Sequence, residues 1–234
     1  MKRHITHLIL FIVVMFLGIS KSNAQTISEE SKLELVNLYN QSQQYLSEGN
    51  YDKAIELKTQ MYNKAKNLGD LKTMAGLAAY EIAQIHSAVR NDLNNYIFWL
   101  KRSDECDFPP ASGLLGDAYL NLNGQHGVQQ DFQKAKYYYE KSDEGRCLWI
   151  IATMYSPTGE FGRNDSEWLK YTSMAVEKGD PDAQFMLGLC YYYGKYYGER
   201  VVNKDHYKGV ELIKKAAQQN HIKAIRFLEE QNIH

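Results

Sequence analysis

The chain has 234 residues, of which 44% are hydrophobic and 24% charged, values typical of a folded soluble protein and unlike those of disordered or multi-span membrane proteins. Its 27 basic residues (Lys and Arg) and 28 acidic residues (Asp and Glu) give a formal net charge of -1. This charge leaves no excess of positive groups to neutralise a nucleic-acid backbone, so the composition predicts one or two folded domains and argues against nucleic-acid binding.

Residues 1–24 have the features of a cleavable signal peptide. Lys2 and Arg3 precede an apolar run from Leu8 to Ile19, and Ser22-Asn23-Ala24 places small residues where a signal peptidase reads. The run is shorter than the ~20 residues that cross a bilayer. We expect cleavage after Ala24, which leaves 24 basic and 28 acidic residues in a periplasmic or secreted chain with no stable membrane insertion.

Residues 25–30 form a short lead, and the remainder contains a repeat with a period of 36 residues. The pattern Ala-x-x-x-Leu-Gly-x-x-Tyr begins at Ala111 and returns 72 residues later at Ala183, while a copy with small residues in place of Ala and Gly begins halfway, at Cys147. A degenerate copy begins at Ala75. A second amphipathic segment follows each copy, which predicts two antiparallel helices per repeat.

Particular residues fit the ends and the seam of these helix pairs. Asp131 is placed to cap a second helix, and the same device recurs at Asp52 and Asp205. Helix stops are expected at Gly49, Gly69, Gly145, Gly179 and Asn220. Small residues at Gly116, Ala152 and Gly188 would let the two helices of a repeat approach closely.

Three motifs stand out in the later repeats: Gly127-Val128-x-x-Asp131-x-x-Lys134-Ala135, Lys215-Ala216-Ala217-Gln218-Gln219-Asn220, and Glu177-Lys178-Gly179-Asp180-Pro181-Asp182-Ala183-Gln184-Phe185-Met186-Leu187-Gly188. These motifs resemble the Sel1-like repeat family, a relative of the tetratricopeptide repeats. The resemblance implies an all-α solenoid of helical hairpins whose usual task is to hold protein partners. We expect divergent tetratricopeptide-like repeats over 31–106, Sel1-like repeats over 107–221 and a C-terminal capping helix within 222–234.

Two departures from the repeat are expected to alter its local curvature. The joint between Lys141 and Cys147 spans 6 positions, against 9 from Arg102 to Ala111. The fifth unit is 41 residues long and so carries five more than the period, within and after a cluster of tyrosines over 191–197.

In such a solenoid the first helix of each repeat lines the concave face. Counting from the Leu-Gly seam selects these partner-binding candidates: Glu81, Asp117, Asn121, Trp149, Thr153, Phe185, Leu189, Tyr192 and Tyr193. The tyrosine cluster adds Tyr196. The candidates change from polar and acidic to aromatic along the groove, and the insertion is expected to display several of the tyrosines. For Trp149 and Phe185 a second interpretation stays open, in which both pack between adjacent repeats.

The sequence carries no compact catalytic, metal-binding or phosphate-binding motif, so we predict no catalytic residue, no metal and no cofactor. Its cysteines, Cys106, Cys147 and Cys190, are odd in number and have no Cys-x-x-Cys spacing, which leaves either three buried thiols or one disulfide. The predicted function is an exported, non-catalytic scaffold that binds a protein or peptide in its concave groove. Two alternatives stay open: an envelope carbohydrate-binding protein that uses the tyrosine cluster, and an enzyme acting on cell-wall or β-lactam substrates.

Overall fold

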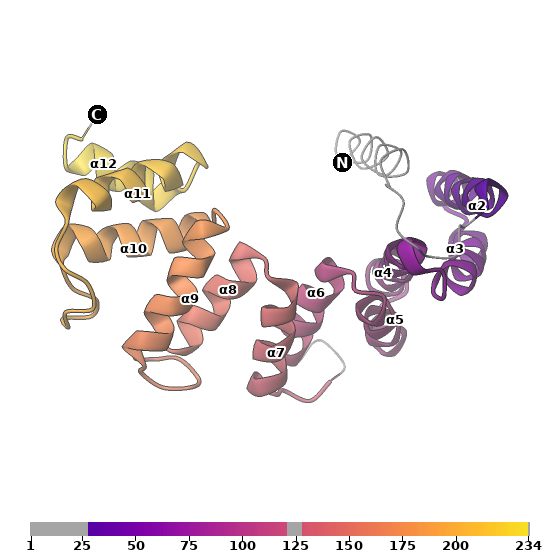
Figure 1. Ribbon diagram of the computed structural model, residues 1–234, viewed down its shortest axis with the longest axis horizontal. Coiled ribbons are helices and arrows are strands. Elements are labelled where there is room, and N and C mark those ends of the chain that lie inside the picture. The colour runs from indigo at the N-terminus through magenta and orange to yellow at the C-terminus, as the bar shows by residue number, and fades with distance from the viewer. Residues whose placement is uncertain (1–27, 121–127, 234) are drawn as a thin grey trace.

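The computed structural model describes residues 28–120 and 128–233, so the predicted signal peptide and Asn121 lie outside the described residues. Regular structure in the described part is helical, apart from an isolated bridge between Tyr196 and Glu199. Helix pairs follow one another along an open arc whose two ends turn toward the same side (Figure 1). The prediction of an all-α solenoid of helical hairpins is confirmed.

Each pair forms one unit, and successive units occupy successive positions along the arc. Unit one is α2 (Glu29–Ser47) and α3 (Tyr51–Ala65); the short turn η1 (Gly69–Leu71) leads into unit two, α4 (Lys72–Ala88) and α5 (Leu93–Glu105). Unit three is α6 (Pro109–Leu120) and α7 (Phe132–Ser142), unit four is α8 (Gly145–Met154) and α9 (Asp165–Glu177), and unit five is α10 (Pro181–Tyr193) and α11 (His206–Gln218). Helix α12 (Ile222–Glu230) follows and contacts α11.

Two of the three predicted helix caps are confirmed. The carboxylates of Asp131 and Asp205 accept hydrogen bonds from the backbone N–H groups of Lys134 and Lys208, each at 3.0 Å. The prediction at Asp52 is wrong, because α3 begins one residue earlier and its cap is Asn50. Asp52 lies instead within the first turn of α3, where its negative charge still complements the helix N-terminus.

The predicted helix stops are correct except at Gly69 and Gly145. Helix α3 already ends at Ala65, and Gly69 is the first residue of η1. Gly49, Gly179 and Asn220 adopt left-handed backbone with φ of 75°, 84° and 62°, the conformation that closes a helix C-terminus. Gly145 is the first residue of α8, and Asp143, with φ of 53°, ends α7. The joint between units three and four is short because this single left-handed residue makes the turn.

The small residues of the predicted seam bring paired helices into close contact. A Cβ added at Gly116 would lie 2.5 Å from the ring of Tyr139 on α7. A Cβ added at Gly188 would lie 2.7 Å from Ile213 Cγ1 on α11. The prediction that these glycines permit close approach is confirmed, and a buried cluster around Trp168 and Tyr139 runs through units three to five.

One backbone hydrogen bond recurs in units three, four and five. The carbonyl oxygens of Tyr119, Tyr155 and Tyr191 accept from the N–H groups of Asp131, Asn164 and Asp205, at 2.9, 3.0 and 2.9 Å respectively. We call this bond the loop clamp, because it joins the end of each first helix to the residue that caps the second. The cap follows the tyrosine by 12, 9 and 14 positions in the three units, so the clamp holds loops of different length.

Candidate partner-binding surface

The two acidic candidates are already matched to groups inside the chain. Glu81 accepts from the fully buried ammonium of Lys58 at 2.5 Å and from Gln43 Nε2 at 3.0 Å, and these bonds join unit two to unit one. Asp117 accepts from the hydroxyl of Tyr139 at 2.7 Å and from Arg146 Nη2 at 2.8 Å. Removing Glu81 would leave the buried Lys58 charge without its partner, and removing Asp117 would leave the buried Tyr139 hydroxyl without its acceptor, so both carboxylates are better explained as structural groups.

The candidates of unit four divide between the core and the surface. Trp149 is partly buried and packs against the cluster that runs through units three to five, which supports the interpretation of packing between repeats. Thr153 is exposed, and its hydroxyl donates to the carbonyl of Ile150 at 2.7 Å. Thr153 is therefore accessible, whereas the ring of Trp149 is accessible only in part.

Helix α12 covers most of the aromatic candidates of unit five. The ring of Phe185 lies 4.8 Å from that of His221 and 6.4 Å from that of Phe227, and the ring of Tyr192 lies 5.1 Å from Phe227. Leu189 packs against the same cluster. The expected open aromatic groove is thus partly filled, because α12 occupies the place that the first helix of another repeat would take.

The expectation that Tyr196 is displayed by the insertion is wrong. Its side chain is only 6% exposed and stacks on the indole of Trp168, with ring centroids 3.9 Å apart. Burial raises the pKa of the Tyr196 hydroxyl. The rings that do reach solvent are those of Tyr193, Tyr197 and Tyr207, at 51%, 65% and 75% exposure.

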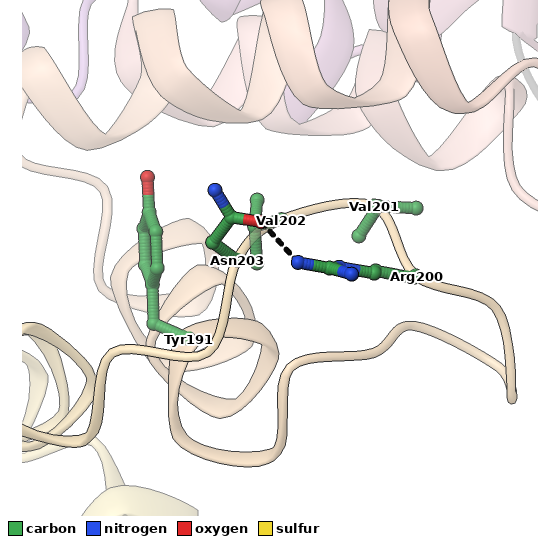
Figure 2. A pocket seen from close by; sticks show the side chains of 5 residues that line it. All are labelled: Tyr191, Arg200, Val201, Val202 and Asn203. Atoms are coloured by element: carbon green, nitrogen blue, oxygen red, sulfur yellow. Dashed lines mark hydrogen bonds between the residues drawn. The ribbon is translucent and has the colours of Figure 1, made fainter.

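The insertion forms an open surface pocket of about 460 Å³, which we call the unit-five pocket (Figure 2). Its lining residues are Tyr191, Arg200, Val201, Val202 and Asn203. Figure 2 shows the Tyr191 ring on one side of Asn203 and the Arg200 guanidinium on the other, with Arg200 donating to Asn203 Oδ1. The pocket therefore combines an aromatic ring, two aliphatic side chains, an amide and a permanent positive charge.

A second cation, Lys208, contacts the tyrosine ring that lines this pocket. Lys208 Nζ lies 4.1 Å from the centroid of the Tyr191 ring and donates to its hydroxyl at 2.8 Å. The sequence reasoning missed Tyr191, Arg200 and Lys208, because it considered the insertion only as a display of aromatic rings. The signal that could have found them is the concentration of basic residues, Lys195, Arg200, Lys204 and Lys208, just where the repeat is lengthened.

The described residues give little support for a metal site or a reactive thiol. No group of three or more His, Cys, Asp or Glu side chains there could hold a metal ion. The three cysteines are free and buried, and burial raises the pKa of each thiol, that of Cys190 to about 12. Among the same residues, no helix has the length and apolar character needed to span a bilayer.

Comparisons with known proteins agree with the repeat. The Sel1 repeat model matches residues 109–142 and 181–221, which correspond to units three and five. No curated protein matches the sequence.

Solved structures with the same helical architecture include a Sel1 repeat protein from Oxalobacter formigenes, with 20% identity, a TM-score of 0.58 and coverage of 81% of this chain and 87% of that one. Another is a protective antigen present in uropathogenic Escherichia coli strains, which displays an SLR fold, with 18% identity, a TM-score of 0.60 and coverage of 87% of this chain and 50% of the antigen. At these identities the likeness concerns the fold alone. Units three and five thus match the Sel1 repeat, and the described part of the chain shares the helical-repeat fold of these solved structures.

Proposed function

We propose that this protein is an exported, non-catalytic scaffold that holds a protein or peptide partner. The repeat architecture supports the proposal, because stacked helix pairs present an extended surface of the kind that solenoid proteins use for binding. The observation that carries it is the exposure of Tyr193, Tyr197 and Tyr207 on the insertion and the helix ends beside it, in the unit whose pocket is lined by Arg200. Aromatic and Arg side chains are the residues that protein interfaces favour.

Export is the second part of the proposal and rests on residues 1–24. The basic start, the apolar run and the small residues before Gln25 support a leader that is removed in the periplasm or on secretion. Amino-terminal sequencing of the protein recovered from the cell envelope or the medium tests it. A mature chain that starts at Gln25 is the expected result, and a chain that keeps Met1 would contradict export by cleavage.

The partner surface is proposed to centre on unit five, although the candidate residues of the concave face extend from unit two to unit five. Glu81, Asp117, Phe185 and Tyr192 all have partners within the chain, whereas Tyr193 remains open to solvent. A glycan site built on Tyr192 and Tyr196 is disfavoured for the same reason. Tyr196 is almost wholly buried against Trp168, and the Tyr192 ring is partly covered by His206 and Phe227.

The test is a crosslinking pull-down from the native envelope with the mature chain. We compare the wild type with the double variant Tyr193→Ala and Tyr197→Ala, and use Tyr137→Ala as the matched control. Tyr137 is a tyrosine of similar exposure, 58%, that lies on α7 of unit three. Circular dichroism first establishes that all three proteins are equally helical.

The expected result is a single protein that the wild type and Tyr137→Ala capture and the double variant loses. Equal capture by all three proteins would move the site away from unit five. If the wild type captures no protein while a glycan array retains it, the scaffold proposal is wrong and the carbohydrate alternative replaces it.

A further inference from the structure

The unit-five pocket occupies a defined position of the repeat. A second cavity, of about 360 Å³, lies at the same position of unit three and is lined by Tyr119, Val128, Gln129, Gln130, Asp131 and Lys134. Lys134 Nζ lies 5.4 Å from the centroid of the Tyr119 ring, as Lys208 Nζ lies over Tyr191. The loop clamp explains the correspondence, because it fixes the tyrosine at the end of the first helix against the first turn of the second.

Unit four closes the same position. The ring of Phe161 packs against Tyr155, with centroids 5.2 Å apart, in the space that the loop leaves open in unit five. Glu167 stands three residues after the cap, where units three and five have lysine. The architecture therefore permits a pocket in every such unit, and the loop sequence decides whether it is open and which charge it carries.

Unit five differs from unit three in its unmatched positive charge. In unit three, Lys134 forms an ion pair with Asp131 at 3.1 Å. Within the described part of the chain, neither Arg200 nor Lys208 forms an ion pair, and their hydrogen bonds go to neutral groups. The carboxylates near these two cations in the sequence are Glu199, Asp205 and Glu211, and none of them forms an ion pair with Arg200 or Lys208. Asp205 accepts from the backbone N–H of Lys208 as the helix cap.

The wall of the unit-five pocket also has free main-chain groups. The bridge between Tyr196 and Glu199 ends before this wall, and the loop clamp at Asp205 begins after it. Between them, residues 200–204 form no backbone hydrogen bond with any other described residue. In the loop of unit four, by contrast, the Phe161 N–H donates to the Met154 carbonyl at 3.0 Å. An irregular segment with unused N–H and C=O groups can pair with an added extended chain.

We propose that the unit-five pocket binds an extended peptide segment that carries an acidic side chain. The carboxylate is placed between the Arg200 guanidinium and the Lys208 ammonium, where charge-assisted hydrogen bonds form with both. The peptide main chain lies along residues 201–203, and its neighbouring side chains contact Val201 and Val202. This inference rests on the proposed function and specifies the chemistry of the partner.

A peptide fits these observations better than an acidic glycan does. Two aliphatic side chains and a row of free backbone groups match the alternation of side chain and amide in an extended peptide. The aromatic wall offers less to a sugar, because Lys208 already covers one face of the Tyr191 ring.

The experiment uses the mature chain and an array of capped hexapeptides in matched pairs that differ only by Glu or Gln at one position. The strongest pair is then titrated into the ¹⁵N-labelled protein. We expect the Glu peptide to bind at least about tenfold more tightly than its Gln partner, with chemical-shift changes in the amides of residues 200–204. The double variant Arg200→Gln and Lys208→Gln is expected to lose that preference.

Lys195→Gln is the matched control, since Lys195 is an exposed lysine of the same insertion that does not line the pocket. It should keep the preference for Glu. An array on which no Glu peptide exceeds its Gln partner overturns the proposal. So does a polygalacturonate solution that shifts amides 200–204 when no peptide does, because the pocket is then a glycan site.

The pull-down separates this failure from that of the proposed function. If the double variant Arg200→Gln and Lys208→Gln captures the same envelope protein as the wild type, the pocket proposal is wrong and the scaffold function stands. If the wild type captures no protein, the scaffold function is wrong as well.

Discussion

Units four and five share the same helix packing but differ in the surface beside the clamped tyrosine. Both place a tyrosine carbonyl in the loop clamp, and both pack a small residue at the seam, Ala152 or Gly188. Unit four fills the space beside its tyrosine with Phe161, whereas unit five leaves a cavity there and lines it with Arg200. The comparison teaches that helix packing fixes where a pocket can form, while the loop between the helices decides whether it exists.

The largest effect should come from the contact that ties the two units together. Tyr196 of unit five stacks on Trp168 of unit four and is almost wholly buried, so Tyr196→Ala should lower the free energy of unfolding by about 3 kcal/mol. The adjacent Tyr197 is 65% exposed, and Tyr197→Ala should change stability by less than about 0.5 kcal/mol. Urea unfolding followed by circular dichroism measures both, and equal losses would place Tyr196 at the surface.

Substitutions of the small seam residue should lower the stability of units four and five by different amounts. In Gly188→Ala the new Cβ would lie 2.7 Å from Ile213 Cγ1 and 3.0 Å from the Gly209 carbonyl oxygen, so we expect a loss of about 2 kcal/mol. Ala152→Gly, the reverse change in unit four, should cost only about 1 kcal/mol through helix propensity. Hydrogen exchange of the α10 and α8 amides reports each loss locally. A neutral Gly188→Ala would show that α10 and α11 can move apart freely.

Opening the closed pocket should have a smaller effect. Phe161→Ala removes the ring that packs on Tyr155, at an expected cost of about 1.5 kcal/mol because the ring is only partly buried. The opened site should still not bind an acidic peptide, because Glu167 takes the place of Lys208. Binding of the Glu hexapeptide by this variant would mean that the cavity alone, without its cations, determines recognition.

The smallest effect concerns the thiols of Cys147 in unit four and Cys190 in unit five. They should differ in their rate of alkylation, without any change in stability. The thiolate is the reactive form, and burial raises the pKa of Cys147 and raises that of Cys190 to about 12. At pH 8 both should react with a thiol reagent more slowly than in the urea-unfolded chain, Cys190 by more than about 100-fold and Cys147 by a smaller factor. Mass spectrometry of alkylated peptides measures each rate. Fast labelling of Cys190 in the folded protein would contradict its burial.

Much of the fold was predictable because the repeat depends on residue patterns that are short-range in the sequence. The Ala-x-x-x-Leu-Gly-x-x-Tyr spacing identifies the seam, and the caps at Asp131 and Asp205 follow from side chains that bond their own backbone. The error at Gly145 has a physical cause, because a left-handed Asp143 can end a helix as glycine does. Sequence alone does not indicate which of two nearby residues makes that turn.

The candidate site was predicted less well, because exposure depends on contacts between distant residues. Tyr196 is buried by Trp168, 28 positions earlier in the chain, and Phe185 is covered by Phe227 of α12. Glu81 looked available in the sequence, yet Lys58 of the previous unit holds it. The expectation that the insertion displays tyrosines remains correct for Tyr193 and Tyr197, whose rings find too little neighbouring surface to bury them.

The loop clamp has a consequence for how such proteins diversify. Because the bond joins the same two backbone atoms in each loop, a loop can grow without moving the helices on either side. Lengthening the closed segment from 9 to 14 positions costs only about 0.4 kcal/mol in closure entropy. Each repeat thus has a loop in which the binding residues can change with little effect on the stability of the scaffold. Grafting residues 192–204 into unit four would make direct use of this property.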